Sequence, residues 1–407
     1  MSRIVVVGGG HAAAQLCASL VEAGAGDRVV MITAESHVPY QRPPLSKSYL
    51  KDADAAPAWL RAESYYSTHG VTIKLGTEVV GVDRQARRLS LSDGTLLSYG
   101  QLVLATGTRA RPLPDLDTSQ FSNVHSLRTI ADADRLRAQF ESAQRVLVVG
   151  GGFIGLEVAS TAAQLGKRVT VLEAAGRLLG RSVSEPIARF LHAHHSLRGV
   201  ELLLNSRISQ VNIEAGRVVS AQVGEQTLPT DLMLVGIGAE PNDGLAQQAG
   251  LYCDDGIVVD SHLRTADPAI WAMGDCVRFP SHILGHLVRL ESVQNANDQA
   301  RCVAANLLGK EQSYGALPWF WSDQGDIRLQ IAGLAQPKYE YEVRGTFTSG
   351  KFSVLGFEGD VLKVVESINM PADHMAARKL IAGGKPVDRA LAVNTEVPLK
   401  SLDGVAA

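Results

Sequence analysis

The sequence predicts an α/β protein made of two dinucleotide-binding (Rossmann-like) domains, the first of them discontinuous, and a C-terminal α+β domain. Two observations predict the Rossmann-like pair: a glycine fingerprint joining a buried strand to a helix occurs at the N-terminus and again from Arg145. The C-terminal domain is predicted because segments with strand patterning are followed by one with helical patterning. These segments lie near Ile327–Gly333, Tyr339–Phe347, Lys351–Phe357, Val361–Asn369 and Ala372–Ala382.

The stretch Arg145–Glu173 carries the more central fingerprint. Its β-branched apolar run, Val146–Val149, is typical of a strand buried on both faces. Three residues then follow at the G-x-G-x-x-G spacing: Gly150, Gly152 and Gly155. The first permits a sharp turn, the second lets the backbone approach a pyrophosphate, and the third brings the helix close to its strand. The next strand, Val169–Leu172, ends in Glu173, where an acid accepts hydrogen bonds from an adenosine ribose. An ordinary α/β turn is the alternative.

The N-terminal fingerprint has the same order of elements. The strand Arg3–Val7 is followed by residues that satisfy G-x-G-x-x-G/A: Gly8, Gly10 and Ala13. The second strand, Arg28–Thr33, leads to Glu35, which is placed to hold a second ribose. A signal peptide is the competing interpretation of this segment. Its apolar run falls short of the roughly 7 to 15 residues of such a signal and glycines interrupt it, so we predict a cytoplasmic protein.

Turn signals indicate the domain boundaries. An antiparallel insertion, with Glu78–Asp83 and an Asp93-Gly94 turn, precedes the buried strand Leu102–Ala105 and a proline-containing exit. A helix at Glu185–Arg198 is expected in the second domain. We predict the first domain at residues 1–111 and 242–317, the second at 112–241, and the C-terminal domain at 318–407.

Composition excludes several classes of protein. A net charge of −3, with scattered Lys and Arg, provides no basic field for nucleic acid. No apolar stretch approaches the roughly 18 residues of a membrane span. None of the cysteines belongs to a C-x-x-C pair, which disfavours a dithiol site and favours small buried residues, although a pair formed only in the fold stays open. The cysteines are Cys17, Cys253, Cys276 and Cys302.

The segment PYQRPPLSKSYL contains three prolines, which exclude a regular helix through it. A helical turn can start at Leu45, with Ser46 as a possible cap. Arg42 and Lys47 are then held in a rigid loop, which suits cations that orient the ring of a redox cofactor; two solvated surface cations are the alternative. Further on, Asp275 follows a strand and can face a cofactor, with an exposed loop acid as the alternative.

Motifs along nearly the whole chain together resemble those of one family, the FAD-dependent, NADH-oxidising ferredoxin reductases of oxygenase systems. The resemblance rests, in order, on VVVGGGHAAA, PYQRPPLSKSYL, LVLATG, VVGGGFIGLEVA, VGIGAEPN, AMGDC, ESVQNANDQAR and PWFWSDQ.

The resemblance implies two cofactor sites. The adenosine diphosphate half of FAD would be held by Gly8, Gly10, His11, Ala12 and Glu35. The rest of FAD would be lined by Arg42, Lys47, Val79, Arg128, Asp275 and Val293. NADH would be bound by Gly150, Gly152, Phe153, Ile154, Gly155, Glu173, Arg181 and Gly238.

Four residues are expected to be catalytic on the same ground. Glu157 looks like the acid beside the nicotinamide, paired with Lys47 near the flavin N5 atom. A solvated helix acid is the alternative for Glu157. Trp319 and Trp321 resemble the family's aromatic residues beside the flavin, and simple core packing is the alternative for them.

The resemblance also implies the electron acceptor. Because PYQRPPLSKSYL lacks the flavin-side cysteine of relatives in the wider fold, thiol chemistry is disfavoured. A hydride from NADH would reduce FAD, and single electrons would leave to a [2Fe–2S] ferredoxin that feeds an oxygenase. Rubredoxin reductase is the runner-up, and a redox-responsive NADH-binding signalling flavoprotein is less favoured. Arg301 is expected to contact the ferredoxin, with a plain surface arginine as the alternative, and the chain is expected to be a monomer or weak dimer.

Overall fold

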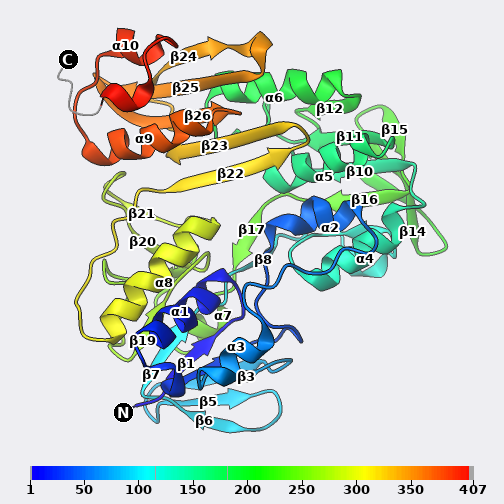
Figure 1. Ribbon diagram of the computed structural model, residues 1–407. Helices are drawn as coiled ribbons and strands as arrows, with labels where there is room; N and C mark the ends of the chain where they lie inside the picture. Colours follow the sequence, from blue (N-terminus) through cyan, green and yellow to red (C-terminus); the bar gives the residue numbers. More distant parts are fainter. Residues whose placement is uncertain (1, 115, 181, 403–407) are drawn as a thin grey trace. The chain divides into compact units, whose positions relative to one another are not determined.

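The computed structural model describes residues 2–114, 116–180 and 182–402, which divide into two compact units (Figure 1). Unit 1 contains the residues up to Gln41, Pro57–Arg109 and Ala239–Ala316. Unit 2 contains Arg42–Ala56, Ala110–Gly238 and the residues from Leu317 onward. Neither unit is continuous in sequence. The predicted division into three domains is not the same partition and stays a prediction.

Unit 1 is built on a five-stranded parallel sheet in the order β19-β7-β1-β2-β3. The central strand β1 is buried at every residue, as a parallel strand covered on both faces requires. Helix α8 lies beside α1, although more than half of the chain separates them in sequence (Figure 1). The bounds are β1 (Ile4–Val7), β2 (Val29–Ile32), β3 (Thr72–Lys74), β7 (Gln101–Leu104), β19 (Ile270–Ala272), α1 (His11–Glu22) and α8 (Val293–Leu307).

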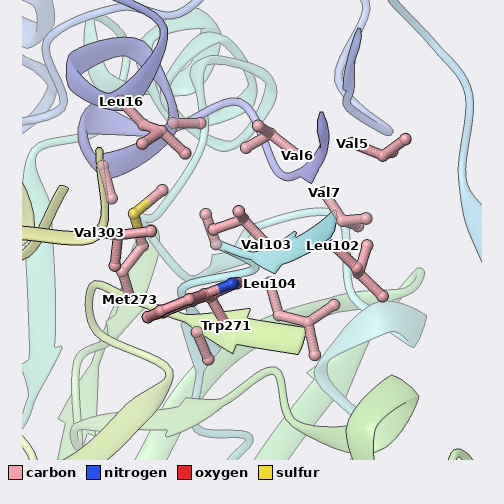
Figure 2. Close-up of a cluster of buried hydrophobic side chains, with 14 of the residues drawn as sticks. Val5, Val6, Val7, Leu16, Leu102, Val103, Leu104, Trp271, Met273 and Val303 are labelled. Carbon is pink, nitrogen blue, oxygen red and sulfur yellow. The ribbon is translucent and has the colours of Figure 1, made fainter. Parts of the chain in front are cut away.

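One apolar core fills unit 1. Figure 2 shows part of it, where side chains of β1 and β7 meet Leu16 of α1, Val303 of α8, and Trp271 and Met273 of the β19 region. The smaller elements of this unit are η1 (Gly26–Arg28), α3 (Glu63–Thr68), β4 (Val79–Asp83), β5 (Arg88–Leu91), β6 (Leu96–Ser98), α7 (Gly244–Gln248), β18 (Ile257–Val258), β20 (Val277–Pro280) and β21 (Leu287–Val288). Where the chain leaves unit 1 and returns to it, β8 (Thr108–Ala110) pairs with β17 (Ala239–Pro241).

Unit 2 contains a second five-stranded parallel sheet, in the order β12-β11-β10-β16-β9. Its bounds are β9 (Val124–His125), β10 (Arg145–Val149), β11 (Arg168–Glu173), β12 (Val200–Leu204) and β16 (Leu232–Val235). The helices and the antiparallel meander of this part are η2 (Pro43–Ser46), α2 (Ser48–Lys51), η3 (Thr118–Gln120), α4 (Ile130–Phe140), α5 (Phe153–Gln164), α6 (Glu185–Leu197), β13 (Gln210–Glu214), β14 (Arg217–Val223) and β15 (Gln226–Pro229).

An antiparallel sheet in the order β22-β23-β26-β25-β24 completes unit 2. Residues of one face, such as Leu329 and Phe352, share a core with Leu156 of α5 and Leu191 of α6. The other face packs against α9 (Figure 1). The bounds are β22 (Trp319–Gln324), β23 (Ile327–Gly333), β24 (Glu340–Thr346), η4 (Phe347–Ser349), β25 (Lys351–Glu358), β26 (Val361–Ile368), α9 (Pro371–Gly383), α10 (Arg389–Val393) and η5 (Leu399–Leu402).

The predicted fold class is confirmed: two Rossmann-like sheets precede an antiparallel C-terminal sheet with its helices. The expected helix in the second Rossmann-like part is α6, which ends at Leu197. The expected role of Ser46 as a helix cap is wrong. The prolines instead start the 3-10 helix η2 at Pro43, and Lys47 occupies the N-cap position of α2. In the described part of the chain, none of the helices combines the length and apolar character needed to cross a lipid bilayer.

Glu366 of β26 is an acid fully buried inside unit 2. Its Oε1 accepts a hydrogen bond from the backbone N–H of Ser184 at 2.9 Å, whereas its Oε2 has no hydrogen-bond partner among the described residues. Burial raises the pKa of Glu366 to about 7, against a smaller lowering by the hydrogen bonds from Ser184. As the pH rises from about 4.5 to about 7, the unfolded chain loses this proton while the folded chain keeps it, so stability falls across that window.

We therefore expect Glu366→Gln, which keeps an acceptor for Ser184, to raise the Tm by a few degrees at pH 8 and to leave it nearly unchanged at pH 4.5. Differential scanning calorimetry at both pH values measures this. Glu225→Gln, in the exposed β14–β15 turn, is the matched control and should show no such pH dependence. A lower Tm at pH 8 in Glu366→Gln would mean that the ionised carboxylate stabilises the fold.

Candidate functional site

The glycine turn of unit 1 has the geometry that its sequence predicts. Gly8 follows β1 with φ +123°, and a Cβ there would lie 2.1 Å from the carbonyl oxygen of Ala105. Gly10 is the N-cap residue of α1, and a Cβ added to it meets nothing within 4 Å. The turn is therefore tight behind Gly8 and open in front of Gly10, as close backbone approach of a ligand requires.

Two other predicted residues of unit 1, Glu35 and Asp275, lie at the carboxyl edge of the same sheet. Glu35 follows β2 and accepts a hydrogen bond from the Tyr40 hydroxyl at 2.6 Å. Asp275 follows β19, so it is at the carboxyl edge that also carries Gly10 and Glu35. The remaining four lie at the starts of their elements: His11 and Ala12 are the first two residues of α1, Val79 is the first of β4 and Val293 is the first of α8.

The glycine turn of unit 2 repeats this arrangement. Gly150 has φ +113°, and only Gly236 O, at 3.9 Å, lies near a Cβ placed on Gly152. A Cβ on Gly155 would lie 2.1 Å from the carbonyl oxygen of Gly150, so the close approach of helix to strand depends on that glycine. Phe153 and Ile154 begin α5 directly after the turn.

Glu173 ends β11 and Gly238 follows β16, and these two strands flank β10 in the same parallel sheet. The Glu173 carboxylate, at the end of β11, accepts hydrogen bonds from the backbone N–H groups of Gly151 at 2.8 Å and Ala175 at 2.7 Å. Gly238 follows β16 with φ +112°, and its carbonyl accepts a hydrogen bond from Arg111 N. The predicted residue Arg181 lies outside the described residues.

Both turns fit the phosphates of a dinucleotide. Within the described residues, neither α1 nor α5 has a side chain that caps its N-terminal N–H groups. Free N–H groups and the positive end of the helix dipole favour a phosphate at such a position. The open space in front of Gly10 and Gly152 gives it room.

Lys47 and Glu157 form an ion pair in unit 2, in which the acid is buried and the lysine is half-buried. The Lys47 Nζ atom lies 2.6 Å from Glu157 Oε2 and also donates to the carbonyl of Pro43 at 2.9 Å. Glu157 is 4% exposed, so the alternative of a solvated helix acid is wrong, whereas the predicted pairing is present. The Ser46 hydroxyl donates to Oε2 at 2.5 Å, and the Ser322 hydroxyl donates to Oε1 at 2.7 Å.

One face of α5 explains how these groups meet. Residues 153, 157 and 161 repeat every four positions and therefore lie on one side of the helix. Phe153 stacks on Phe320 with ring centroids 4.5 Å apart, Glu157 meets Ser322, and the Thr161 hydroxyl donates to the carbonyl of Ser46 at 3.0 Å. The helix thus lies along β22 and the η2 segment, with an acid placed midway between apolar and hydroxyl contacts.

Trp319 and Trp321 lie on the other face of β22. Side chains alternate along a strand, and Ser322 pairs with Leu329, which belongs to the α5–α6 core. Trp319 pairs with Ala332, which packs on the α9 side, and its ring lies 5.7 Å from that of Trp321. The structure therefore brings Lys47 and Glu157 together but places both tryptophans on the opposite side of the strand.

Arg42 and Arg128 are joined within unit 2, because Arg42 Nη1 donates to the Arg128 carbonyl at 2.7 Å. This contact anchors the proline segment to the chain just before α4 and fixes the Arg42 guanidinium, in agreement with the rigid loop predicted for Arg42.

The cysteines are free thiols. Burial raises the pKa of Cys17 to about 12 and that of Cys302 to about 11, so both remain protonated near neutral pH. The expectation that no cysteine takes part in electron transfer stays a prediction, and these environments support it.

Sequence reasoning missed the hydroxyl and amide groups around Glu157. Besides its tryptophans, the motif PWFWSDQ places Ser322 and Gln324 two residues apart, both fully buried. Polar residues at alternate positions of an otherwise apolar strand are a detectable signal, because a strand face that points into a core is normally apolar.

The chain was compared with known families, curated proteins and solved structures. Residues 2–300 match the family described as "Pyridine nucleotide-disulphide oxidoreductase", and residues 319–403 match "Reductase C-terminal". Rhodocoxin reductase of Rhodococcus erythropolis is 42% identical over 98% of this chain and 93% of its own length. The ferredoxin–NAD(+) reductase component of the anthranilate 1,2-dioxygenase system of Burkholderia cepacia is 42% identical over 98% of both chains. The reductase in the crystal structure of the covalent putidaredoxin reductase–putidaredoxin complex superposes with a TM-score of 0.95 at 37% identity, covering 100% of this chain and 99% of that one.

The open space at Gly10 makes a sharp mutational test of the unit 1 turn. Gly10→Val should fold with a Tm close to that of the flavin-free wild type, because nothing lies within 4 Å of the new Cβ, yet it fills the space that a pyrophosphate needs. We expect bound flavin, measured as the ratio of visible to protein absorbance, to fall more than about tenfold. Gly244→Val, at the start of α7 with equally open surroundings, is the control and should keep its flavin. Equal flavin content in both variants would contradict the assignment of this turn.

Proposed function

The chain belongs to the pyridine nucleotide-disulphide oxidoreductase family, and from that membership we propose that it is an NADH-dependent ferredoxin reductase of an oxygenase system. It is an oxidoreductase that uses FAD and NAD(H). The turn of unit 1, with Gly10 and Glu35, would hold the adenosine half of FAD, and the turn of unit 2, with Gly152 and Glu173, would hold NADH.

The Lys47–Glu157 ion pair is the observation that carries the proposal. A flavin, when bound, accepts a hydride and releases its electrons singly. Lys47 supplies a fixed cation, since Glu157 and the Pro43 carbonyl hold its ammonium group on two sides. A fixed positive charge beside a site that gains negative charge stabilises that charge without reorganisation. The chain thus provides a charged group where relatives with thiol chemistry provide cysteines, and an external acceptor takes the electrons.

The acceptor is tested directly by mixing NADH, catalytic enzyme and a [2Fe–2S] ferredoxin without oxygen and following bleaching of the cluster. Rapid ferredoxin reduction is expected. Faster reduction of rubredoxin would favour a rubredoxin reductase. If NADH reduced the bound flavin but neither carrier accepted electrons, the proposal would be wrong and a signalling role would be favoured.

The proposal includes the cytoplasmic location and the monomer or weak dimer predicted from the sequence. The segment that superficially resembles a signal peptide is the central strand β1, the fingerprint turn and α1, all of them parts of the core of unit 1. A chain that uses this segment to complete its sheet needs to retain it.

NADH should be preferred over NADPH. The Glu173 carboxylate is fixed by two backbone N–H groups at the end of β11, where it would meet a 2′-phosphate. Unit charges about 4 Å apart repel by about 4 kcal/mol at an effective dielectric constant of 20, and salt screening reduces this. We expect Glu173→Gln to raise kcat/KM for NADPH about tenfold relative to that for NADH. Steady-state kinetics with both nucleotides measures the ratio.

Glu201→Gln is the control for that change, because it removes the same charge from the neighbouring strand β12. The nucleotide ratio should not move in this variant. An unchanged ratio in Glu173→Gln as well would show that Glu173 does not face the ribose.

Arg301 is proposed as one contact of the ferredoxin. It lies on α8, its side chain is 55% exposed, and its guanidinium pairs with Asp298 at 2.6 Å and with Gln15 Oε1 at 3.3 Å. The ion pair partly neutralises the charge, so the arginine acts as an oriented donor with moderate long-range attraction. Acidic iron–sulfur carriers are steered by such local charge.

Arg301→Glu should lower kcat/KM for ferredoxin about three- to tenfold at low salt. In this variant kcat/KM for ferredoxin should depend much less on salt concentration, and the rate of reduction of a small uncharged dye should stay near that of the wild type. Arg135→Glu is the matched control, since Arg135 forms an i,i+3 pair with Asp132 on the exposed side of α4. Equal losses with ferredoxin and dye would instead mean that Arg301 supports the flavin site.

A further inference from the structure

A chain of buried hydrogen bonds leads away from the ion pair through the C-terminal sheet. Ser322 Oγ lies 2.7 Å from Glu157 Oε1, Gln324 Nε2 lies 3.2 Å from Ser322 Oγ, and His195 Nε2 lies 2.8 Å from Gln324 Oε1. Ser322 and Gln324 are fully buried and His195 is 1% exposed. The chain joins α5, β22 and α6, all within unit 2.

The carboxylate at one end fixes the direction of every bond. An ionised Glu157 can only accept, so the Ser322 hydroxyl donates to it. The hydroxyl oxygen then accepts from the Gln324 amide nitrogen, which leaves the amide oxygen to accept from His195 Nε2–H. Every proton therefore points towards Glu157, and each donor polarises the next in the sense that stabilises a negative charge there.

His195 is suited to the far end of such a chain as a neutral donor. Burial lowers its pKa, and the nearby charges of His194, Arg198 and His192 lower it further, against the opposing effect of its hydrogen bond to Gln324. Its Nδ1 has no hydrogen-bond partner among the described residues, which is consistent with a single proton, carried on Nε2. Beyond α6, Asp326 pairs with His194 and Arg198 at the surface.

The two carboxylate oxygens divide their partners between two parts of the chain. Oε2 accepts from Lys47 Nζ and the Ser46 hydroxyl, both from the proline segment, whereas in the described part of the chain Oε1 accepts only from the Ser322 hydroxyl. An acid that is buried to this degree stays ionised only when donors replace the water it has lost. Without Ser322, Oε1 would lose its hydrogen bond and the carboxylate would lose its fixed orientation towards Lys47.

We propose that Ser322, Gln324 and His195 are positioning residues of the reductase, which act through this hydrogen-bond chain to keep the Glu157 carboxylate ionised and aimed at Lys47. This rests on the proposed function for the role of the ion pair. It gives the C-terminal sheet a part in preparing the site, because β22 supplies two of the three links.

The test measures the ionisation of Glu157 in the flavin-loaded enzyme by infrared spectroscopy. The carbonyl band of the protonated carboxyl, identified by its absence in Glu157→Gln, is followed as the pH is lowered. In Ser322→Ala this band should appear at a pH at least about one unit higher than in wild type, which corresponds to about 1.4 kcal/mol. The rate of flavin reduction by NADH should fall about tenfold at the acidic end of the pH profile, with little change in the Kd for NAD+.

Matched variants separate positioning from simple packing. Ser322→Thr keeps the hydroxyl and should restore both readouts. Ser353→Ala removes a hydroxyl that is equally buried in the same sheet but hydrogen-bonded to Ser367 and Asp373, and it should change neither. If Ser322→Ala fails to fold, Gln324→Leu breaks the next link in the chain. In that variant the band should also appear at a higher pH, by an amount that corresponds to about a threefold increase in proton affinity.

A lower Tm with an unmoved infrared titration and an unmoved pH profile would overturn the proposal and leave the chain as packing alone. The infrared titration does not involve an acceptor protein. A wild-type enzyme that failed to reduce ferredoxin would therefore contradict the proposed function while leaving this result intact.

Discussion

The structure of unit 2 depends on one buried carboxylate. Glu157 lies on α5 between a proline-containing segment from the first part of the chain and a strand from the last, and it accepts from a hydroxyl or ammonium group on each. Ionic groups are rarely buried unless they are paired, because the cost of removing their water is large. The segments that supply these donors are therefore restricted to conformations that deliver them: η2 starts on two prolines, and Ser322 follows three aromatic residues along β22.

A shared core supports this arrangement. Leu156, next to Glu157 in the chain, packs with Ile187 of α6 and with Leu329 of the antiparallel sheet. The polar chain that reaches His195 is thus surrounded by apolar contacts between the same three elements. Water is excluded from such an environment, so each hydrogen bond is electrostatically stronger than at a surface, and each missing bond is more costly.

Much of the fold could be predicted from sequence, because the features that specify it are short stretches of neighbouring residues. The two glycine fingerprints specify a turn, a helix start and a helix–strand distance through a few residues, and Gly155 confirms this, because a Cβ there would collide with the Gly150 carbonyl. The Lys47–Glu157 pair, in contrast, joins residues 110 positions apart, and only resemblance to a family could suggest it. The roles of Ser46 and Gln324 depend on which side chains surround them in three dimensions, so local propensity gave the wrong role for the first and none for the second.

The assignment of segments to units has a consequence for the order in which the protein is made. The sheet of unit 1 needs β19, which ends at Ala272, whereas all the strands of the parallel sheet in unit 2 lie between Val124 and Val235. A ribosome therefore releases a full set of strands for the second sheet before it releases the last strand of the first. Until that moment β7 presents an unpaired edge on a nascent chain whose first fingerprint is already synthesised, and an unpaired strand edge is a template for association with other chains. In the interval between synthesis of Leu104 and Ile270, this edge of β7 is therefore open to association with other chains.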